Sequence, residues 1–453
     1  MADYLKVLDD ECPKSREVVE RAKKFIPGGV QHNLAFNYPF PLVIDRAEGA
    51  YLYDIDGRRY IDFLQAGGPT ILGSNDPVVR RQVIEMLERV GPSTGLFHEY
   101  ELALAEEVNR HMPSVEMFRM LGSGTESVLA AIRVARLATG KRRVVKIGGA
   151  YHGWSDQLVY SLKVPNTKRY EAHGIPAACT RQTDEARPND LDSLERVLAF
   201  NRLRGGTACV LIEPVGPESG TRPVAMDYNK GVRELCDKYG ALLVFDEVVT
   251  AFRVGLGGAQ GYFGVRPDLT TFGKIVAGGY PSAGGLGGRR DLIMLMAAGL
   301  ETGKKRAYVG GTMAANPLSA AAGYFTLREI EKRDACAVAG RAGDRLASGL
   351  KARIEALGLP FVAYNQGSIV HLETVGAMFF ELDLLHIGTF LRETKARKHF
   401  MEEYGAAYAA EGLVTLAGSR MYTSAAQNDA IIDEAIARFS RVFDKVGSEG
   451  AEA

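Results

Sequence analysis

The stretch Ala241-Leu-Leu-Val-Phe-Asp-Glu-Val-Val-Thr-Ala-Phe-Arg253 decides how this sequence folds. Its first five residues form a continuous apolar run, which is typical of a strand buried on both faces of a sheet. The residues before it place Val232, Cys236 and Tyr239 on one face of a helix, and Gly240 ends that helix. A helix followed directly by a buried strand is the repeating unit of a parallel sheet.

The same alternation extends to both sides of this stretch. A helix is predicted at Thr125–Ala138, and short apolar strands are predicted at Arg143–Ile147, Ala208–Ile212 and Leu269–Phe272. We therefore expect an α/β fold, in which a mostly parallel sheet carries helices on both faces.

The two ends of the chain differ from this central part. The N-terminal segment contains a predicted helix at 15–26 and a hairpin that turns at Asp56-Gly57. The C-terminal part has long helical patterns and weaker strands. The sequence thus predicts a large domain at 75–320, a smaller α+β domain at 321–453, and an N-terminal segment at 1–74 that packs with the smaller domain.

Composition excludes several classes of partner. The 453 residues include 55 Lys or Arg and 55 Asp or Glu, which gives no electrostatic basis for binding nucleic acid or an anionic membrane. No apolar run approaches the roughly 18 residues of a membrane helix, and the N-terminus lacks a signal-peptide pattern. The five cysteines are scattered without a Cys-x-x-Cys pair, which predicts free thiols, no metal site and a cytoplasmic setting.

Polar clusters follow several of the predicted strands. Glu213 and Asp246 each end a strand, and Lys274 closely follows another. Gly122-Ser-Gly-Thr-Glu126 opens a predicted helix, and Tyr151-His-Gly-Trp154 follows a further strand. Because ligands of open α/β sheets bind beyond the carboxyl ends of the strands, we expect these clusters to form one site.

Ser123-Gly124-Thr125 has two interpretations. In the first interpretation, the three residues only cap a helix, because Ser and Thr are favoured at the N-cap position. They equally suit a phosphate site, because glycine allows the backbone to approach a ligand and a helix N-terminus offers N–H groups to an anion. The short motif alone does not decide between these two.

Asp246 and Lys274 also have a structural and a chemical interpretation. Most strand-end carboxylates and most lysines are simply solvated. Lys274, however, precedes the small, apolar Ile275-Val-Ala-Gly-Gly279, where a surface helix would carry more charge. A partly desolvated amine attacks an aldehyde readily, and a carboxylate keeps a pyridine nitrogen protonated. Tyr151 and Val248 are suited to cover the two faces of such a ring, although half-buried aromatic residues are common without a ligand.

Taken in order, these clusters resemble the class III aminotransferases, a family of fold type I pyridoxal-phosphate enzymes. The resemblance runs from about Ile26 to the end of the chain, and the order and spacing of the pieces make it specific. The matching stretches are Gly122-Ser-Gly-Thr-Glu126, Tyr151-His-Gly153, Glu213-Pro-Val215, Asp246-Glu-Val-Val-Thr-Ala-Phe-Arg253, Phe272-Gly-Lys274, Gly311-Thr312 and Asn316-Pro-Leu318.

The resemblance implies pyridoxal 5'-phosphate bound as a Schiff base to Lys274. Asp246 is expected to pair with the ring nitrogen, and Tyr151 and Val248 are expected to enclose the ring. Both Lys274 and Asp246 are thereby implied as the catalytic residues.

The resemblance assigns the remaining candidates to the phosphate and to the edge of the ring. Ser123, Gly124 and Thr125 are expected to hold the phosphate. Glu213 and His152 are expected to lie in the polar network around the ring. Thr312 is expected to reach the phosphate of a neighbouring subunit, which implies a homodimer with composite active sites.

Within the family, Ile26-Pro-Gly-Gly-Val30 and Gly49-Ala-Tyr-Leu-Tyr-Asp54 resemble the glutamate-1-semialdehyde aminomutases. That branch carries a carboxylate-gripping Arg after Gly-Gly-Val, whereas Gln31-His-Asn-Leu-Ala-Phe36 has none. Because the cofactor residues are intact and this Arg is missing, we expect an aminotransferase. It would move an amino group from an amine or amino acid to a keto acid, ketone or aldehyde.

Two alternative functions and an open substrate question remain. An aminomutase would move the amino group within one molecule. A dinucleotide-dependent oxidoreductase is disfavoured, because Ser127 breaks the Gly-x-Gly-x-x-Gly pattern. Arg420 either binds a substrate carboxylate or lies on the surface. Four aromatic residues either line a substrate pocket or belong to the core: Phe36, Tyr38, Phe40 and Phe97.

Overall fold

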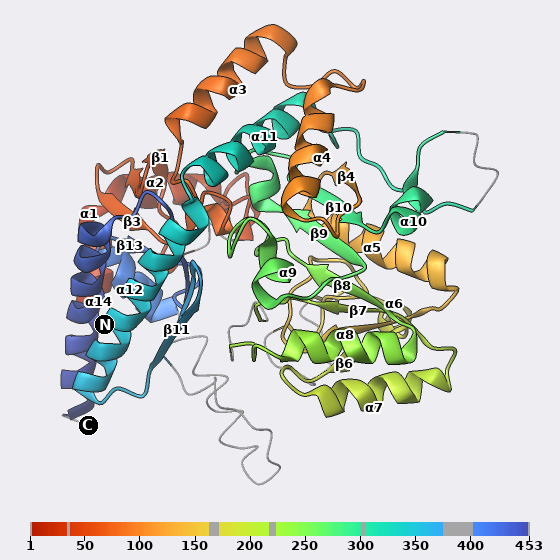
Figure 1. The fold of residues 1–453 in the computed structure, drawn as a ribbon. Helices are drawn as coiled ribbons and strands as arrows, with labels where there is room; N and C mark the ends of the chain where they lie inside the picture. Colours follow the sequence, from red (N-terminus) through yellow and green to blue (C-terminus); the bar gives the residue numbers. More distant parts are fainter. Residues whose placement is uncertain are drawn as a thin grey trace. The chain divides into compact units, whose positions relative to one another are not determined.

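The computed structural model describes residues 2–33, 37–162, 172–216, 223–299, 305–374 and 402–451. The chain divides into two compact units, and each is described by itself (Figure 1). The first unit contains Met1–Asp76 and Asp334–Ala453, and the second contains Pro77–Ser219 and Pro223–Arg333.

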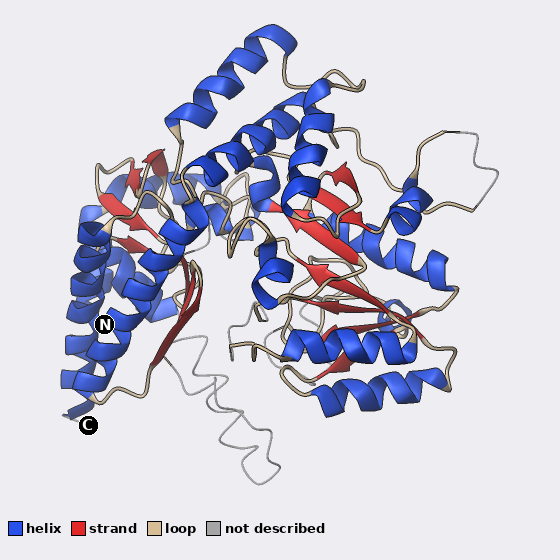
Figure 2. Ribbon diagram, in the orientation of Figure 1, coloured by secondary structure: helices blue, strands red, loops and turns tan. Residues whose placement is uncertain are grey.

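The second unit is built on a seven-stranded sheet with the strand order β4-β10-β9-β8-β7-β5-β6 (Figures 1 and 2). The five strands from β9 to β6 pair in parallel, and β10 runs antiparallel to both of its neighbours. This confirms the expected α/β fold with a mostly parallel sheet. The strands are β4 (Met117–Leu121), β5 (Arg143–Ile147), β6 (Thr183–Ala186), β7 (Thr207–Ile212), β8 (Leu242–Asp246), β9 (Leu269–Gly273) and β10 (Gly284–Gly288).

Neighbouring residues of the central strands pack into two different cores. Val144 of β5 and Val244 of β8 pack with residues of α5, whereas Val145 and Phe245 pack with residues of α7 and α8. Helices therefore cover both faces of the sheet, which explains why its strands are apolar throughout. The helices of this unit are α3 (Pro77–Val90), α4 (Glu99–His111), α5 (Gly124–Thr139), α6 (Ala177–Thr180), α7 (Leu191–Arg202), α8 (Tyr228–Tyr239), α9 (Gly258–Phe263), α10 (Arg290–Ile293), α11 (Pro317–Lys332) and the short 3₁₀ helices η4 (Lys274–Ala277) and η5 (Met294–Met296).

Helix α11 belongs to the second unit because it packs against α3 and α4. The boundary between the units therefore falls after Arg333. The sequence placed it after residue 320, within this helix, because an apolar helix face does not reveal which neighbour buries it.

The first unit combines the N-terminal segment with the C-terminal part of the chain. Its main core contains side chains from β3, α12 and α14, among them Ile61, Leu350 and Phe439. Its sheets have the orders β1-β2-β3-β13 and β11-β12-β14. Its elements are α1 (Ala2–Glu11), α2 (Pro13–Ala22), η1 (Pro27–Gly29), β1 (Ile44–Glu48), β2 (Tyr51–Asp54), β3 (Arg59–Asp62), η3 (Gln65–Gly67), α12 (Ala335–Leu357), β11 (Val362–Gln366), β12 (Ile369–Glu373), β13 (Leu413–Val414), β14 (Arg420–Tyr422) and α14 (Asp429–Ala451).

Two local predictions for the N-terminal segment have different outcomes. The hairpin is confirmed, because β2 and β3 pair antiparallel on either side of Asp56-Gly57. The helix predicted to reach residue 26 instead ends at Ala22. Phe25, which suggested that the helix was longer, is 85% exposed, so it has little apolar contact with the described residues of this unit to hold it in a helix.

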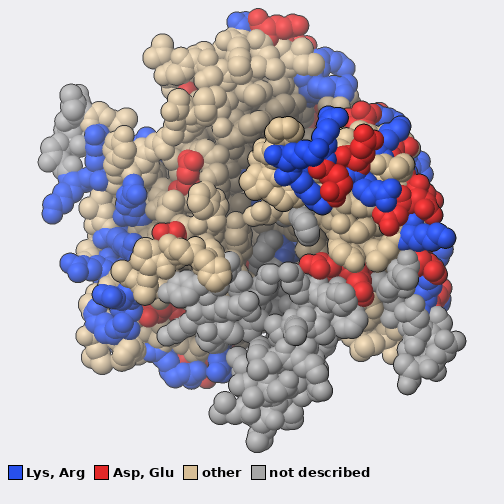
Figure 3. Space-filling view, turned by 180° about the vertical axis from the view of Figure 1, so that it is seen from behind, with Lys and Arg blue, Asp and Glu red and all other residues tan. Residues whose placement is uncertain are grey.

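The outer surface carries groups of both charges. On the face drawn in Figure 3, basic and acidic side chains both occur, and they are mixed most closely near its right-hand edge. In the described part of the chain, no helix combines the length and the apolar character that crossing a membrane requires.

Candidate active site

Parallel strands bring the predicted polar residues to one edge of the seven-stranded sheet. Asp246 is the last residue of β8, and Lys274 follows the last residue of β9. Glu213 directly follows β7, the strand on the other side of β8. Because these three strands are parallel neighbours, their carboxyl ends lie side by side.

Asp246 is buried and its carboxylate is held from three directions. Oδ2 lies 2.7 Å from Nδ1 of His152. Oδ1 accepts hydrogen bonds from the Thr271 hydroxyl at 2.9 Å and from the Val248 N–H at 3.2 Å. A carboxylate has about four acceptor positions, so these three contacts leave room for one more donor.

His152 is also buried, and its position favours a neutral imidazole. Since a carboxylate only accepts, Nδ1 carries the hydrogen of the contact with Asp246. Burial lowers the pKa of His152, and the hydrogen bond and charge of Asp246 oppose that effect. A nearby cation, Lys146, lowers the pKa further.

Lys274 has an unusual backbone conformation. Its φ is +50°, in the left-handed region that residues with a Cβ rarely occupy. Such strain persists only where the surrounding structure enforces it, and it concentrates at functional sites. The residue lies at the turn from β9 into η4, two positions after Phe272 of the buried strand.

The N-terminus of α5 offers backbone donors. Ser123 is the N-cap, and its Oγ accepts from the N–H of Glu126 at 3.3 Å. Glu126 Oε2 accepts from the N–H of Gly122 at 2.8 Å. Neither bond uses the N–H groups of Gly124 and Thr125, which remain as the donors that an anion would meet at this helix end.

Glycines bring the strand ends and the helix into close contact. A Cβ atom at Gly124 would lie 2.8 Å from Val248 Cγ2, and a Cβ at Gly273 would lie 2.8 Å from Val248 Cγ1. A Cβ at Gly153, which has φ +82°, would overlap Thr125. The structure therefore places Val248 beside the residue before Lys274 and places the loop after β5 against the start of α5.

Tyr151 and Glu213 form a further contact at this edge. The N–H of Tyr151 donates to Glu213 Oε1 at 3.1 Å. The Tyr151 side chain is 42% exposed, so its ring is open to contact with another molecule.

Thr312 lies on an exposed segment that passes over α5. Arg133 of α5 donates to the carbonyl of Tyr308, and a Cβ at Gly311 would lie 3.5 Å from Glu126 Oε2. The segment thus runs close to the first turn of α5, where the phosphate was expected, with Thr312 facing outward.

Two residues of this site were not predicted from the sequence. Thr271 pairs directly with Asp246 across β8 and β9, and its hydroxyl holds the carboxylate. Ser127 donates to the carbonyl of Phe272 at 3.1 Å and accepts from the N–H of Gly285 at 2.8 Å. Alternation along β9 would have placed Thr271 beside a strand-end acid, which is the only signal that the sequence offers for it.

The residues considered for substrate choice lie largely in the first unit. Arg420 is 8% exposed and faces His371 of β12, so it is not a surface residue. Phe40 belongs to a core cluster with Leu8 and Cys12. Phe97, in the second unit, is 77% exposed, and Phe36 lies outside the described residues.

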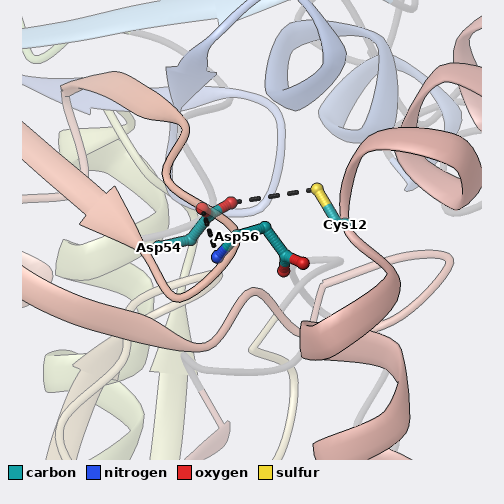
Figure 4. A group of neighbouring side chains, drawn as sticks. All are labelled: Cys12, Asp54 and Asp56. Carbon is teal, nitrogen blue, oxygen red and sulfur yellow. Dashed lines mark hydrogen bonds between the residues drawn. The ribbon is translucent and has the colours of Figure 1, made fainter.

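Three neighbouring side chains of the first unit could in principle bind a metal ion, but they are held in a network of hydrogen bonds: Cys12, Asp54 and Asp56 (Figure 4). Asp56 accepts from the N–H groups of Lys14 and Ser15 at the start of α2. Arg58 lies 3.4 Å from the thiol of Cys12, where a metal ion would meet its positive charge. Burial raises the pKa of the Cys12 thiol, which therefore stays protonated and binds metal poorly. In the second unit, Arg110 and Arg328 similarly neutralise the group formed by Glu107, His111 and Glu331.

Comparison with known proteins decides the family. The sequence matches the family Aminotransferase class-III over residues 34–389. The chain belongs to the class III aminotransferases. It is therefore an enzyme that depends on pyridoxal phosphate, as the sequence predicted.

Solved structures of this class resemble the whole chain. An ω-transaminase from Sphaerobacter thermophilus is 29% identical, with a TM-score of 0.83, and the match covers 94% of this chain and 96% of that one. A β-phenylalanine aminotransferase from Variovorax paradoxus is 27% identical, with a TM-score of 0.84 and coverage of 99% and 97%. A glutamate-1-semialdehyde aminomutase from Pseudomonas aeruginosa PAO1 is 22% identical, with a TM-score of 0.85 and coverage of 98% and 97%, which shows the fold alone.

Proposed function

We propose that this aminotransferase moves an amino group from an amine or amino acid donor to a keto acid, ketone or aldehyde. One observation carries the proposal. Asp246 at the end of β8 is fixed by His152 and Thr271, and Lys274 follows the end of the neighbouring strand β9. A fixed carboxylate at the end of one strand and an amine after the end of its neighbour suit a pyridine aldehyde cofactor.

The residues of the second unit fit pyridoxal phosphate. The remaining acceptor position of Asp246 suits the N–H of a protonated pyridine ring. The N–H groups of Gly124 and Thr125 suit the phosphate. Tyr151 and Val248 are proposed to enclose the ring, with Glu213 fixing the backbone of Tyr151.

When bound, the cofactor withdraws electrons from the carbon that bears the amino group. Lys274 Nζ would hold the cofactor covalently and would serve as the base that takes the proton from that carbon. Asp246 keeps the ring nitrogen protonated throughout. His152 orients Asp246, and its own burial excludes water from that side.

Borohydride reduction tests the cofactor site. The purified protein should show a long-wavelength absorbance band that donors bleach, and reduction should fix the cofactor on Lys274, as located by mass spectrometry. A protein that takes up no cofactor, or that is labelled on another lysine, would contradict the proposal.

The donor is proposed to carry its amino group away from an α-carboxylate. The support is the lack of an Arg in Gln31–Phe36 and the names of the two transaminases that are 29% and 27% identical. A panel of simple amines, β-amino acids and α-amino acids, with pyruvate or 2-oxoglutarate as acceptor, tests this. Arg420→Ala should raise KM for acidic substrates and leave KM for simple amines unchanged if Arg420 binds a carboxylate.

An aminomutase is the second candidate function, because the sequence pattern of Ile26–Val30 resembles that branch of the family. Turnover of a single amino aldehyde without any second carbonyl substrate would support it. A strict requirement for both donor and acceptor would support the aminotransferase.

We further propose a cytoplasmic homodimer. All five cysteines are free thiols in the structure, which suits a reducing compartment. Thr312 is exposed, and its neighbours Tyr308 and Met313 are 75% and 49% exposed, which suits burial against a second copy.

A further inference from the structure

A buried lysine lies behind the proposed ring-nitrogen site. Lys146 is the fourth of the five residues of β5, is fully buried and lies between the buried apolar residues Val145 and Ile147 of that strand. A lysine in such a place is rare, because burying an ammonium group is costly unless polar groups replace its water. The proposed reaction assigns no step to this side chain.

The ammonium group of Lys146 binds the returning limb of a loop. Nζ donates to the carbonyl of Tyr160 at 2.6 Å and to that of Leu158 at 3.2 Å, and it lies 4.7 Å from the centre of the Tyr160 ring. The N–H of Gly149 donates to the carbonyl of Ser161 at 2.9 Å, which closes the same loop. The returning end of residues 149–161 is therefore held against the end of β5, and Tyr151 and His152 lie within the loop that these bonds close.

Lys146 also acts on His152 through its charge. In the pKa of His152, burial is the main lowering influence and Lys146 adds to it, while Asp246 opposes both. Other charged groups near these residues are Glu185, which pairs in register with Lys146, and the buried Glu247, which follows Asp246. Glu213 binds the N–H of Tyr151, and Lys274 lies at the end of β9. His152 Nε2 is buried without a hydrogen-bond partner among the described residues, so an added proton there would be unsatisfied.

We propose that Lys146 is a positioning residue for the cofactor: it anchors the loop that carries Tyr151 and His152, and its positive charge keeps His152 neutral. A neutral His152 leaves the full negative charge of Asp246 to the ring nitrogen. An imidazolium at this position would instead share that charge and weaken the hold of Asp246 on the ring proton. This inference rests on the proposed role of Asp246.

Two substitutions of Lys146 separate the effect of its hydrogen bonds to the loop from the effect of its positive charge. Lys146→Gln removes the charge but retains an amide that can donate to the carbonyls of Leu158 and Tyr160. Lys146→Met removes both. Arg143→Met is the matched control, because Arg143 is a buried cation of the same strand that pairs with Asp184 instead.

The titration of His152 in the cofactor-loaded protein is the decisive measurement. Selective ¹³C labelling of the eight histidines, with His152 assigned from a His152→Gln variant, allows its pKa to be followed by NMR. Both Lys146 variants should raise that pKa, whereas Arg143→Met should leave it unchanged. Cofactor affinity should fall at least several-fold further in Lys146→Met than in Lys146→Gln.

The outcomes distinguish this inference from the proposed function. An unchanged His152 titration in Lys146→Gln, with Lys274 still labelled by borohydride, would overturn the inference and leave the proposed function standing. Labelling of another lysine would remove the proposed function, whatever the titration shows. If Lys146→Met does not fold, Lys146→Gln alone still tests whether the charge of Lys146 affects the titration of His152.

Discussion

Asp246 is the residue whose charge matters most to the proposed chemistry. Asp246→Asn keeps the size of the side chain and one acceptor oxygen but removes the charge that holds the ring proton. We expect kcat to fall about 10²-fold or more, while the protein still takes up cofactor. Steady-state kinetics together with the absorbance of the bound cofactor would measure both quantities.

Thr271→Val is the graded control for Asp246. It removes one hydrogen bond to the charged carboxylate and leaves those from His152 and Val248, so we expect a loss of about tenfold, smaller than that of Asp246→Asn. Equal losses in Thr271→Val and Asp246→Asn would mean that orientation of the carboxylate, and not its charge, limits the rate.

The ionised carboxylates of Asp62 and Asp56 are predicted to have opposite effects on the stability of the folded protein. Burial raises the pKa of Asp62 to about 6 from the ordinary 3.8, and the backbone N–H of Gln65 offsets only part of this. The folded protein therefore binds this proton more tightly than the unfolded chain, and stability is lost as pH rises through 4 to 6. Asp62→Asn should be more stable than the natural protein at pH 8, by up to about 3 kcal/mol, and should lose much of that advantage at pH 5.

Asp56 provides the matched comparison in the same unit. Partial burial acts to raise its pKa, but hydrogen bonds from the Ser15 side chain and from the N–H groups of Lys14 and Ser15 outweigh it and lower the pKa. Its stabilisation is therefore present at pH 5 to 8 and is lost only in stronger acid. Asp56→Asn should destabilise by about 1 kcal/mol at both pH values in urea unfolding, so a parallel pH dependence of the two variants would contradict this assignment.

Position relative to a strand end was enough to predict that three candidate residues lie at one edge of the sheet. Asp246, Lys274 and Glu213 each follow an apolar run, and the carboxyl ends of parallel strands meet at one edge. Thr271 and Ser127 were not predicted, because a hydroxyl inside a strand or on the inner face of a helix is equally common where it binds only the backbone. Which carbonyl or carboxylate it reaches depends on the register between elements that are distant in sequence.

Helix α5 is the element in which the proposed phosphate site and the packing of the sheet depend on each other. Gly124→Ala should force Val248 away from the ring, because the new Cβ would lie 2.8 Å from its side chain. We expect cofactor affinity to fall about tenfold or more, which corresponds to about 1.4 kcal/mol. Equilibrium titration with pyridoxal phosphate, followed by absorbance, would measure this.

Gly140 at the other end of α5 supplies the control. It has φ +68° and open space around it, so Gly140→Ala should cost about 1 kcal/mol of stability through backbone strain alone. Its cofactor affinity should equal that of the natural protein. If Gly140→Ala weakens cofactor binding as much as Gly124→Ala does, the effect belongs to helix stability and not to the contact with Val248.

Periodicity predicted most elements of the sheet and failed where glycine dominates. Strands β5, β7, β8 and β9 are apolar runs in the sequence, and the structure confirms them. Strand β10 is Gly-Gly-Leu-Gly-Gly, which is more typical of a loop. It forms a strand because Phe118 and Val115 fill the space where side chains at Gly285 and Gly287 would lie. That close packing is a tertiary property and leaves no periodic signal.

At the scale of the whole molecule, the testable question is whether one chain completes its own active site. Thr312 is exposed on a segment that passes over the first turn of α5 of the same chain. The proposed homodimer assigns Thr312 instead to the phosphate of the second copy. The two arrangements differ in what happens when two differently damaged chains are combined.

Mixed dimers of Lys274→Ala and Thr312→Ala chains separate these arrangements. If Thr312 serves the partner, the site built on the intact Lys274 receives an intact Thr312 from the Lys274→Ala chain. One site in each mixed dimer should then bind cofactor with normal affinity and have normal kcat. If Thr312 serves its own chain, the only site with Lys274 also lacks its Thr312, and mixing restores nothing. Differently tagged chains, purified as mixed dimers and titrated with pyridoxal phosphate, would decide this, with homodimers of each variant as controls.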